Sequence, residues 1–114
     1  CHGAYSAAVD LSTRVVFVAT TSGRTALLFS KYRFSGVTIG ASDNEATVRR
    51  MALYWGVMPV KVPHYRNYHR LMDAIAADAR KKRLVKRGET AVFVVGSRPG
   101  VVGTTNLLMV SQVD

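Results

Sequence analysis

The feature that most constrains the fold is a regular alternation between short apolar runs and segments with helical spacing. Short apolar runs are typical of strands that are buried on both faces of a sheet. They fall at residues 15–19, 37–40, 57–62, 91–95 and 107–113. Helical spacing is found at residues 4–11, 25–32, 42–55 and 68–79. This alternation predicts an α/β fold, in which right-handed β-α-β crossovers build a mainly parallel sheet with helices on both faces.

Two features predict how the outer strands lie. Pro59 falls inside the run at residues 57–62, and because proline cannot donate a ladder hydrogen bond, this strand is expected at an edge. The final strand follows the run at residues 91–95 through a loop that has no room for a helix. A parallel crossover needs about a dozen residues or more. We therefore expect the final strand to run antiparallel to its neighbour.

The helical segments carry more detailed expectations. Residues 26–29 are all apolar, so the helix over residues 25–32 is expected to be buried nearly all round. Ser42 is followed three residues later by Glu45, which predicts a capping box at the start of the next helix. The inner stripe of that helix is predicted to be Val48, Met51, Ala52 and Trp55. The clearest amphipathic pattern in the chain consists of Tyr68, Leu71, Met72, Ile75, Ala76 and Ala79.

Length and composition indicate one domain, which we take to span residues 1–114. The chain starts at Cys1 with a short first helix, so we expect it to have been excised from a longer protein. Its single cysteine excludes an intramolecular disulfide and suits a reducing compartment such as the cytoplasm. No apolar run approaches the ~18 residues needed to cross a bilayer. We therefore expect no membrane-spanning segment and no membrane partner.

The net charge of +9 suits nucleic acid, an acidic membrane surface or a phosphorylated metabolite, and it also suits simple solubility and packing against another domain. The densest basic run is Arg80, Lys81, Lys82, Arg83, Lys86 and Arg87. It follows the long helix, where cations complement the negative end of the helix dipole. No aromatic interleaving or RNA-binding motif accompanies it, so we rank nucleic acid last among the partners.

A string of small hydroxylated residues follows the first buried strand: Thr20, Thr21, Ser22, Gly23, Arg24 and Thr25. A helix is predicted to start there, and the first turn of a helix offers unpaired N–H groups and a partial positive charge to a phosphate. Hydroxyl groups and a guanidinium add further donors. The same residue types also form ordinary turns and helix caps, so the pattern leaves a phosphate site and a plain cap as open alternatives.

A glycine-rich loop follows the strand at residues 91–95 and would emerge from the same sheet edge. Its candidate ligand-closing residues are Ser97, Arg98, Pro99, Gly100 and Gly103. The alternative is a wide connection between antiparallel strands, in which such residues are abundant. A basic cluster near the start of the long helix could supply further anion contacts, or it could be a solvated face. Its members are Lys61, His64, Arg66, His69 and Arg70.

Catalytic and metal-binding patterns are missing from the sequence. His64 and His69 are five residues apart, so they do not share a helix face, and no cysteine joins them. No motif pairs two carboxylates for acid–base work, and no nucleophile elbow is present. We therefore expect no catalytic residue, no metal site and no cofactor in this chain.

Read together, several segments in order resemble the C-terminal domain of pyruvate kinase. They are residues 15–26, 30–33, 52–60, 84–89 and 103–107, which read VVFVATTSGRTA, SKYR, ALYWGVMPV, LVKRGE and GTTNL. The resemblance covers nearly the whole chain. It implies a three-layer α/β/α fold whose five-stranded mixed sheet has the order 3-2-1-4-5, with strand 5 antiparallel.

The resemblance also implies a regulatory role, because in this family the domain carries the allosteric effector site and part of the tetramer interface. The loop at residues 20–25 would hold one phosphate of fructose 1,6-bisphosphate or a related sugar phosphate, and residues 97–104 would close over it. Three features depart from the animal-type enzymes: Leu71 stands where an arginine is expected, no tryptophan precedes it near the start of the long helix, and Ser97 stands where another tryptophan is expected. A sugar monophosphate or a nucleotide monophosphate is therefore an equal alternative, with Lys61, His64, Arg66 and Arg70 as possible second anion contacts.

The family's catalytic groups, with their Mg²⁺ and K⁺ ions, lie on a separate barrel domain that is absent from this chain. The domain alone is therefore not expected to convert phosphoenolpyruvate and ADP to pyruvate and ATP. Two other functions stay open on the sequence. One is a purely structural module between subunits that binds no effector, and the other is the basic nucleic-acid-binding domain that we rank last.

Overall fold

The computed structural model describes residues 2–20, 23–63, 68–95 and 107–112. Helices and strands alternate along the chain until the last two strands, which follow each other directly. In order, the elements are α1 (His2–Asp10), β1 (Val15–Ala19), α2 (Arg24–Ser30), β2 (Val37–Ser42), α3 (Glu45–Met51), β3 (Val57–Lys61), α4 (Tyr68–Lys81), β4 (Thr90–Val95) and β5 (Leu107–Gln112). No described helix has the length and apolarity required to span a membrane.

The five strands form one sheet in the order β3-β2-β1-β4-β5. The pairs β1–β2, β1–β4 and β2–β3 are parallel, and β5 runs antiparallel to β4. The sheet order, the reversed last strand and the edge position of the strand that contains Pro59 are all confirmed. β1 occupies the centre of the sheet, and all five of its residues are buried, as the continuous apolar run predicted.

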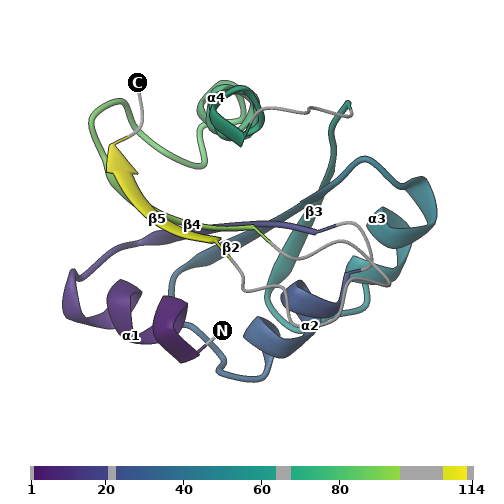
Figure 1. Ribbon diagram of the computed structural model, residues 1–114, viewed down its shortest axis with the longest axis horizontal. Helices are drawn as coiled ribbons and strands as arrows, with labels where there is room; N and C mark the ends of the chain where they lie inside the picture. Colours follow the sequence, from purple (N-terminus) through teal and green to yellow (C-terminus); the bar gives the residue numbers. More distant parts are fainter. Residues whose placement is uncertain (1, 21–22, 64–67, 96–106, 113–114) are drawn as a thin grey trace.

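Helices cover both faces of the sheet (Figure 1), with α4 on one face and α1, α2 and α3 on the other. Beneath α4, Phe17 and Phe93 stack with ring centroids 4.8 Å apart, and Ile75 belongs to the same buried cluster. On the opposite face, Phe29 from α2 and Met51 from α3 form a second buried cluster with the residues of β1 and β4 that point to this face. Alternate residues of β1 and β4 therefore feed two cores, which explains why these strands are apolar throughout.

α2 is less buried than its apolar sequence predicted. Ala26 and Phe29 are buried, whereas Leu27 and Leu28 are 37% and 39% exposed. The expectation of a helix buried nearly all round is therefore wrong. α2 lies on an outer layer of the domain, so only one side of it contacts the sheet, and its apolar second side faces outward.

The predicted capping box at Ser42 is also wrong. Ser42 is the last residue of β2, where it pairs with Lys61 of β3, so the strand is longer than predicted. The N-cap of α3 is Asn44, whose side-chain oxygen accepts a hydrogen bond from the backbone N–H of Thr47 at 3.1 Å. The Ser42 hydroxyl oxygen accepts from the backbone N–H of Asn44 at 3.1 Å and so supports the cap from outside the helix.

α3 ends at Met51, earlier than the predicted stripe required. Met51 is fully buried and Val48 packs partly against the same cluster, as expected. Ala52 and Trp55 lie beyond the helix, however, and both are exposed. The guanidinium of Arg33 lies over the Trp55 ring, 4.8 Å from its centroid, so this indole contacts a cation at the surface rather than the core.

Candidate functional site

The end of β1 leads into the segment that the sequence identified as a candidate phosphate site. Thr20 is buried, and its backbone N–H donates to the carbonyl of Ala41 at 2.9 Å, which prolongs the contact with β2 beyond the strand. Its hydroxyl oxygen accepts a hydrogen bond from the backbone N–H of Gly23 at 3.0 Å. Thr20 therefore closes the turn from within, as the plain-turn alternative expects of it. Thr21 and Ser22 lie outside the described residues.

Gly23 is the N-cap of α2 and has the left-handed conformation, with φ 85° and ψ −5°. It provides no side-chain cap, and the first turn of α2 contains no acidic residue. A Cβ at this position would lie 3.2 Å from Cγ2 of Thr47 and 3.3 Å from the hydroxyl oxygen of Tyr54. Glycine is therefore required here twice, by backbone conformation and by close packing.

The next two residues differ in exposure, since the side chain of Arg24 is exposed and that of Thr25 is buried. An exposed guanidinium can reach a ligand in solvent and bind a phosphate through two parallel hydrogen bonds. Arg24 is thus the described residue of this loop that is best suited to direct contact with an anion, whereas Gly23 is buried and its backbone N–H is bonded to Thr20.

The carboxyl ends of β1 and β4 lie side by side at this edge of the sheet, with Ala19 paired to Val95. From β1 the chain passes through α2 to β2 on one side, whereas β4 is reached through α4 on the other face (Figure 1). The connections diverge at this point, which makes it a topological switch point of the sheet. Crevices at such points are where open α/β sheets usually bind ligands.

The remaining predicted contacts are only partly described. Lys61 ends β3 and is exposed, but β2 separates it from β1, a distance of about 10 Å across two strand spacings. Arg70 lies in the first turn of α4 and is exposed. His64 and Arg66 lie outside the described residues, as do the closing-loop residues Ser97, Arg98, Pro99, Gly100 and Gly103.

Comparison with known proteins assigns the family. Residues 1–111 match the family model described as "Pyruvate kinase, alpha/beta domain". The chain belongs to this family. It is 35% identical over 107 residues to pyruvate kinase from Geobacillus stearothermophilus, which covers 94% of this chain and 18% of the relative. It is 32% identical over 112 residues to pyruvate kinase from Clostridium acetobutylicum, which covers 98% of this chain and 24% of the relative.

The fold is similar to that of solved pyruvate kinase structures. A solved structure of Cryptosporidium parvum pyruvate kinase in complex with ADP superposes with a TM-score of 0.87 at 24% identity, over 98% of this chain and 22% of that chain. A second structure of the Cryptosporidium parvum enzyme superposes with a TM-score of 0.85. The chain thus spans 18% to 24% of the curated pyruvate kinases given above.

Two residues that support the loop of this pyruvate kinase domain were missed by sequence reasoning. Thr47 is fully buried and presents its methyl group to Gly23, and Tyr54 brings its hydroxyl to the same glycine. Thr47 is polar and therefore has no place in an apolar stripe. The only sequence signal for Tyr54 is its place in the family-like segment at residues 52–60.

Metal ligands do not gather in this pyruvate kinase domain as far as it is described: within residues 2–20, 23–63, 68–95 and 107–112, no three His, Cys, Asp or Glu side chains form a group that could hold a metal ion.

Proposed function

We propose that this domain is the regulatory part of a pyruvate kinase and that it binds a phosphorylated effector at the carboxyl ends of β1 and β4. The observation that carries the proposal is the pairing of Ala19 with Val95, because it brings the carboxyl ends of β1 and β4 side by side, where ligands usually bind in open α/β sheets. Family membership supports it, since the matching family model spans residues 1–111.

The chemistry of the loop supports the same proposal. Gly23 forms the left-handed turn at the start of α2, and Arg24 provides an exposed guanidinium directly after it. Residues 97–103 would close over the bound ligand. The effector would be fructose 1,6-bisphosphate or a sugar or nucleotide monophosphate, with Lys61, His64, Arg66 and Arg70 available for a second anionic group.

Regulation would act through the rest of the enzyme. A ligand that binds one quaternary state more tightly than another shifts the population toward the first state. The catalytic barrel, the reaction of phosphoenolpyruvate with ADP, the Mg²⁺ and K⁺ ions, the tetramer and a cytoplasmic location all belong to this proposal for the whole protein.

A thermal-shift experiment tests the effector site. The chain is melted with fructose 1,6-bisphosphate, with a sugar monophosphate and with a nucleoside monophosphate in turn. A ligand that binds only the folded state, at a concentration of about 100 times its Kd, stabilises that state by about 2.7 kcal/mol. The variant Arg24→Ala with Thr25→Val removes the guanidinium and the hydroxyl, so it is expected to lose the shift in melting temperature. Valine retains the shape of the buried threonine, so the fold should be preserved. As a control, Lys31→Ala removes an exposed charge at the other end of α2, and this variant should retain the thermal shift. An undiminished shift in the double variant would remove this site from consideration.

A second candidate function is a subunit interface without effector binding. The observation that favours it is a set of exposed apolar side chains on α1 and the turn directly after it, on α2 and on the last strand. They are Val9, Leu11, Leu27, Leu28 and Val110. Sedimentation at increasing protein concentration tests this function: association that Leu27→Ser with Leu28→Ser abolishes, together with no response to any phosphorylated metabolite, would favour the interface alone.

A further inference from the structure

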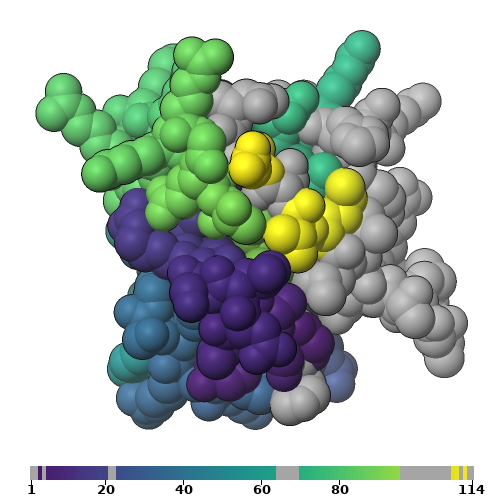
Figure 2. Space-filling model, turned by 90° about the vertical axis from the view of Figure 1, so that its left-hand side faces the viewer, coloured from purple at the N-terminus to yellow at the C-terminus, as the bar shows by residue number. Residues whose placement is uncertain are grey.

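A charged hollow lies at the opposite end of β1 and β4 from the proposed effector site. It has a volume of about 680 Å³ and is lined by Arg14, Arg83, Lys86, Arg87, Gly88 and Glu89. Arg14 immediately precedes β1 and Glu89 immediately precedes β4, so the hollow is at the amino ends of the two central strands. Figure 2 shows the α4–β4 segment, in green, directly beside the segment that contains α1, in purple, on this face.

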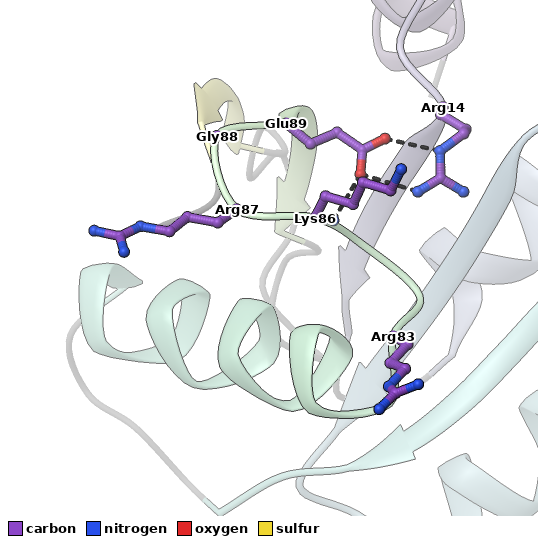
Figure 3. Close-up of a pocket in the computed structure, with 6 residues that line it drawn as sticks. All are labelled: Arg14, Arg83, Lys86, Arg87, Gly88 and Glu89. Carbon is purple, nitrogen blue, oxygen red and sulfur yellow. Dashed lines mark hydrogen bonds and ion pairs between the residues drawn. The ribbon is translucent and has the colours of Figure 1, made fainter.

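Two residues that line the hollow, Arg14 and Glu89, form an ion pair with two hydrogen bonds. Nε of Arg14 donates to Oε2 of Glu89 at 2.8 Å, and Nη2 donates to Oε1 at 3.0 Å (Figure 3). Nη2 also donates to the carbonyl of Leu84 at 3.0 Å. None of these three bonds uses Nη1 of Arg14, so that nitrogen retains donors for a ligand.

The loop that forms the wall is a closed turn. The backbone N–H of Glu89 donates to the carbonyl of Lys86 at 3.1 Å, and the backbone N–H of Lys86 donates to Oε1 of Glu89 at 3.0 Å. Gly88 has φ 84°, as the third residue of a type II turn requires. Because neither bond uses the side chain of Lys86 or Arg87, those two side chains can be removed without removing the bonds that shape the turn.

The charge of the hollow is strongly unbalanced. Four cationic side chains and one carboxylate line it, which leaves three positive charges in excess. The carboxylate is already engaged, since the hydrogen bond from Arg14 is the main reason that the pKa of Glu89 lies below its ordinary value. On the preceding helix, Asp78 is paired with Lys82 at 3.0 Å, so it does not neutralise the hollow either.

We propose that this hollow binds a compact phosphate anion that carries several charges, of the pyrophosphate or bisphosphate class. Guanidinium groups match phosphate oxygens in geometry and charge. Glu89 holds the guanidinium of Arg14 in one position, where it can bind one phosphate group. In Figure 3, Arg83 and Arg87 point away from the Arg14–Glu89 pair on opposite sides. Exposed side chains of this length change rotamer within nanoseconds, so both can turn inward onto a bound anion.

The lining determines which part of a ligand is recognised. Among the described residues that line the hollow, none is aromatic or apolar, so it offers no surface for stacking a nucleobase. The site is independent of the proposed effector site, since the two lie at opposite ends of β1 and β4 and share no residue.

Calorimetric titration of the full chain with pyrophosphate tests the proposal. The titration is made in the Arg24→Ala, Thr25→Val background, so that loss of the effector site and loss of this site are separate results. The added substitutions Lys86→Ala and Arg87→Ala are expected to weaken binding by about tenfold or more. The control adds Lys31→Ala and Arg49→Ala, which remove two exposed charges elsewhere and should change the affinity by less than about twofold.

Three results would overturn the proposal. The first is no binding of pyrophosphate at low salt. The second is an equal loss of affinity in the two charge-matched variants, because binding would then follow net charge alone. The third is tighter binding of a hexaglutamate peptide than of pyrophosphate at the same salt concentration, which would assign the hollow to an acidic protein segment.

Discussion

Gly23 and Tyr54 meet where the loop after β1 packs against the turn after α3. The hydroxyl oxygen of Tyr54 lies 3.3 Å from the position that a Cβ of Gly23 would occupy. Tyr54 itself is half-buried between Leu53 and Trp55, which are 85% and 50% exposed. The loop that we propose to bind the effector is therefore in direct contact with a turn whose neighbouring side chains face outward.

Substitution of Gly23 by alanine separates backbone strain from packing when it is compared with Gly88→Ala. The two glycines have φ 85° and φ 84°, but an added Cβ has close neighbours only at Gly23 and meets nothing within 4 Å at Gly88 among the described residues. We expect Gly88→Ala to cost about 1 kcal/mol for the left-handed conformation. Gly23→Ala should cost about 1 kcal/mol more, because Thr47 and Tyr54 must move. Chemical denaturation measures both, and equal costs would contradict the packing described here.

Acid is expected to weaken the link between Arg14 and Glu89. The pKa of Glu89 is lowered from 4.5 by the hydrogen bond from Arg14, so the folded state favours the carboxylate more than the unfolded state does. The contribution is fully present above pH 4.5 and is lost as pH falls toward the lower folded value. Melting curves of Glu89→Gln should therefore depend less on pH below 4.5 than those of the unsubstituted chain. Parallel curves would show that this pair contributes nothing to acid stability.

Asn44→Ala tests the observed cap of α3. Loss of the side-chain oxygen that accepts from Thr47 should reduce the free energy of unfolding by about 1 kcal/mol, whereas Asn44→Gly should cost only about 0.3 kcal/mol. Urea denaturation of the two variants provides the comparison. If Glu45→Ala proved as destabilising as Asn44→Ala, a capping box at Ser42 would have to be reconsidered.

Ile75→Ala tests the core beneath α4. Its side chain is 2% exposed, and truncation of such a residue costs about 3 kcal/mol through lost burial and the cavity that remains. Leu53→Ala is the matched control, since its side chain is 85% exposed and should change stability by less than about 0.5 kcal/mol. Similar costs at both positions would mean that α4 does not pack on the sheet as described.

Local pattern predicted the elements well because burial leaves a periodic trace. The continuous run at residues 15–19 indicated a strand buried on both faces, and Pro59 indicated an edge strand. The errors arose where tertiary contacts decide. Pairing with Lys61 draws Ser42 into β2 and moves the cap of α3 to Asn44. Leu28 is exposed although its neighbours in the sequence are apolar, because α2 lies in an outer layer and contacts the sheet with one side only.

The candidate loop could be read from the sequence more directly than the residues that support it, and its role in binding stays a prediction. The hydroxylated residues 20–25 are contiguous, so their pattern can be read locally. Thr47 and Tyr54 support the loop from a different helix and turn, and only the fold brings them to Gly23. For the same reason the bond between Arg14 and Glu89, which are 75 residues apart, left no mark in the sequence.

The position of β4 between β1 and β5 has a consequence for biosynthesis. β4 is made after β1, so the partner of β1 on one side is not complete until residue 95 has been added. A ribosome that adds about 5–20 residues per second therefore leaves one long edge of β1 without its mate for several seconds. During that interval the nascent chain presents an apolar strand edge of the kind that chaperones shield, and a stalled or truncated product that lacks β4 would be prone to aggregate.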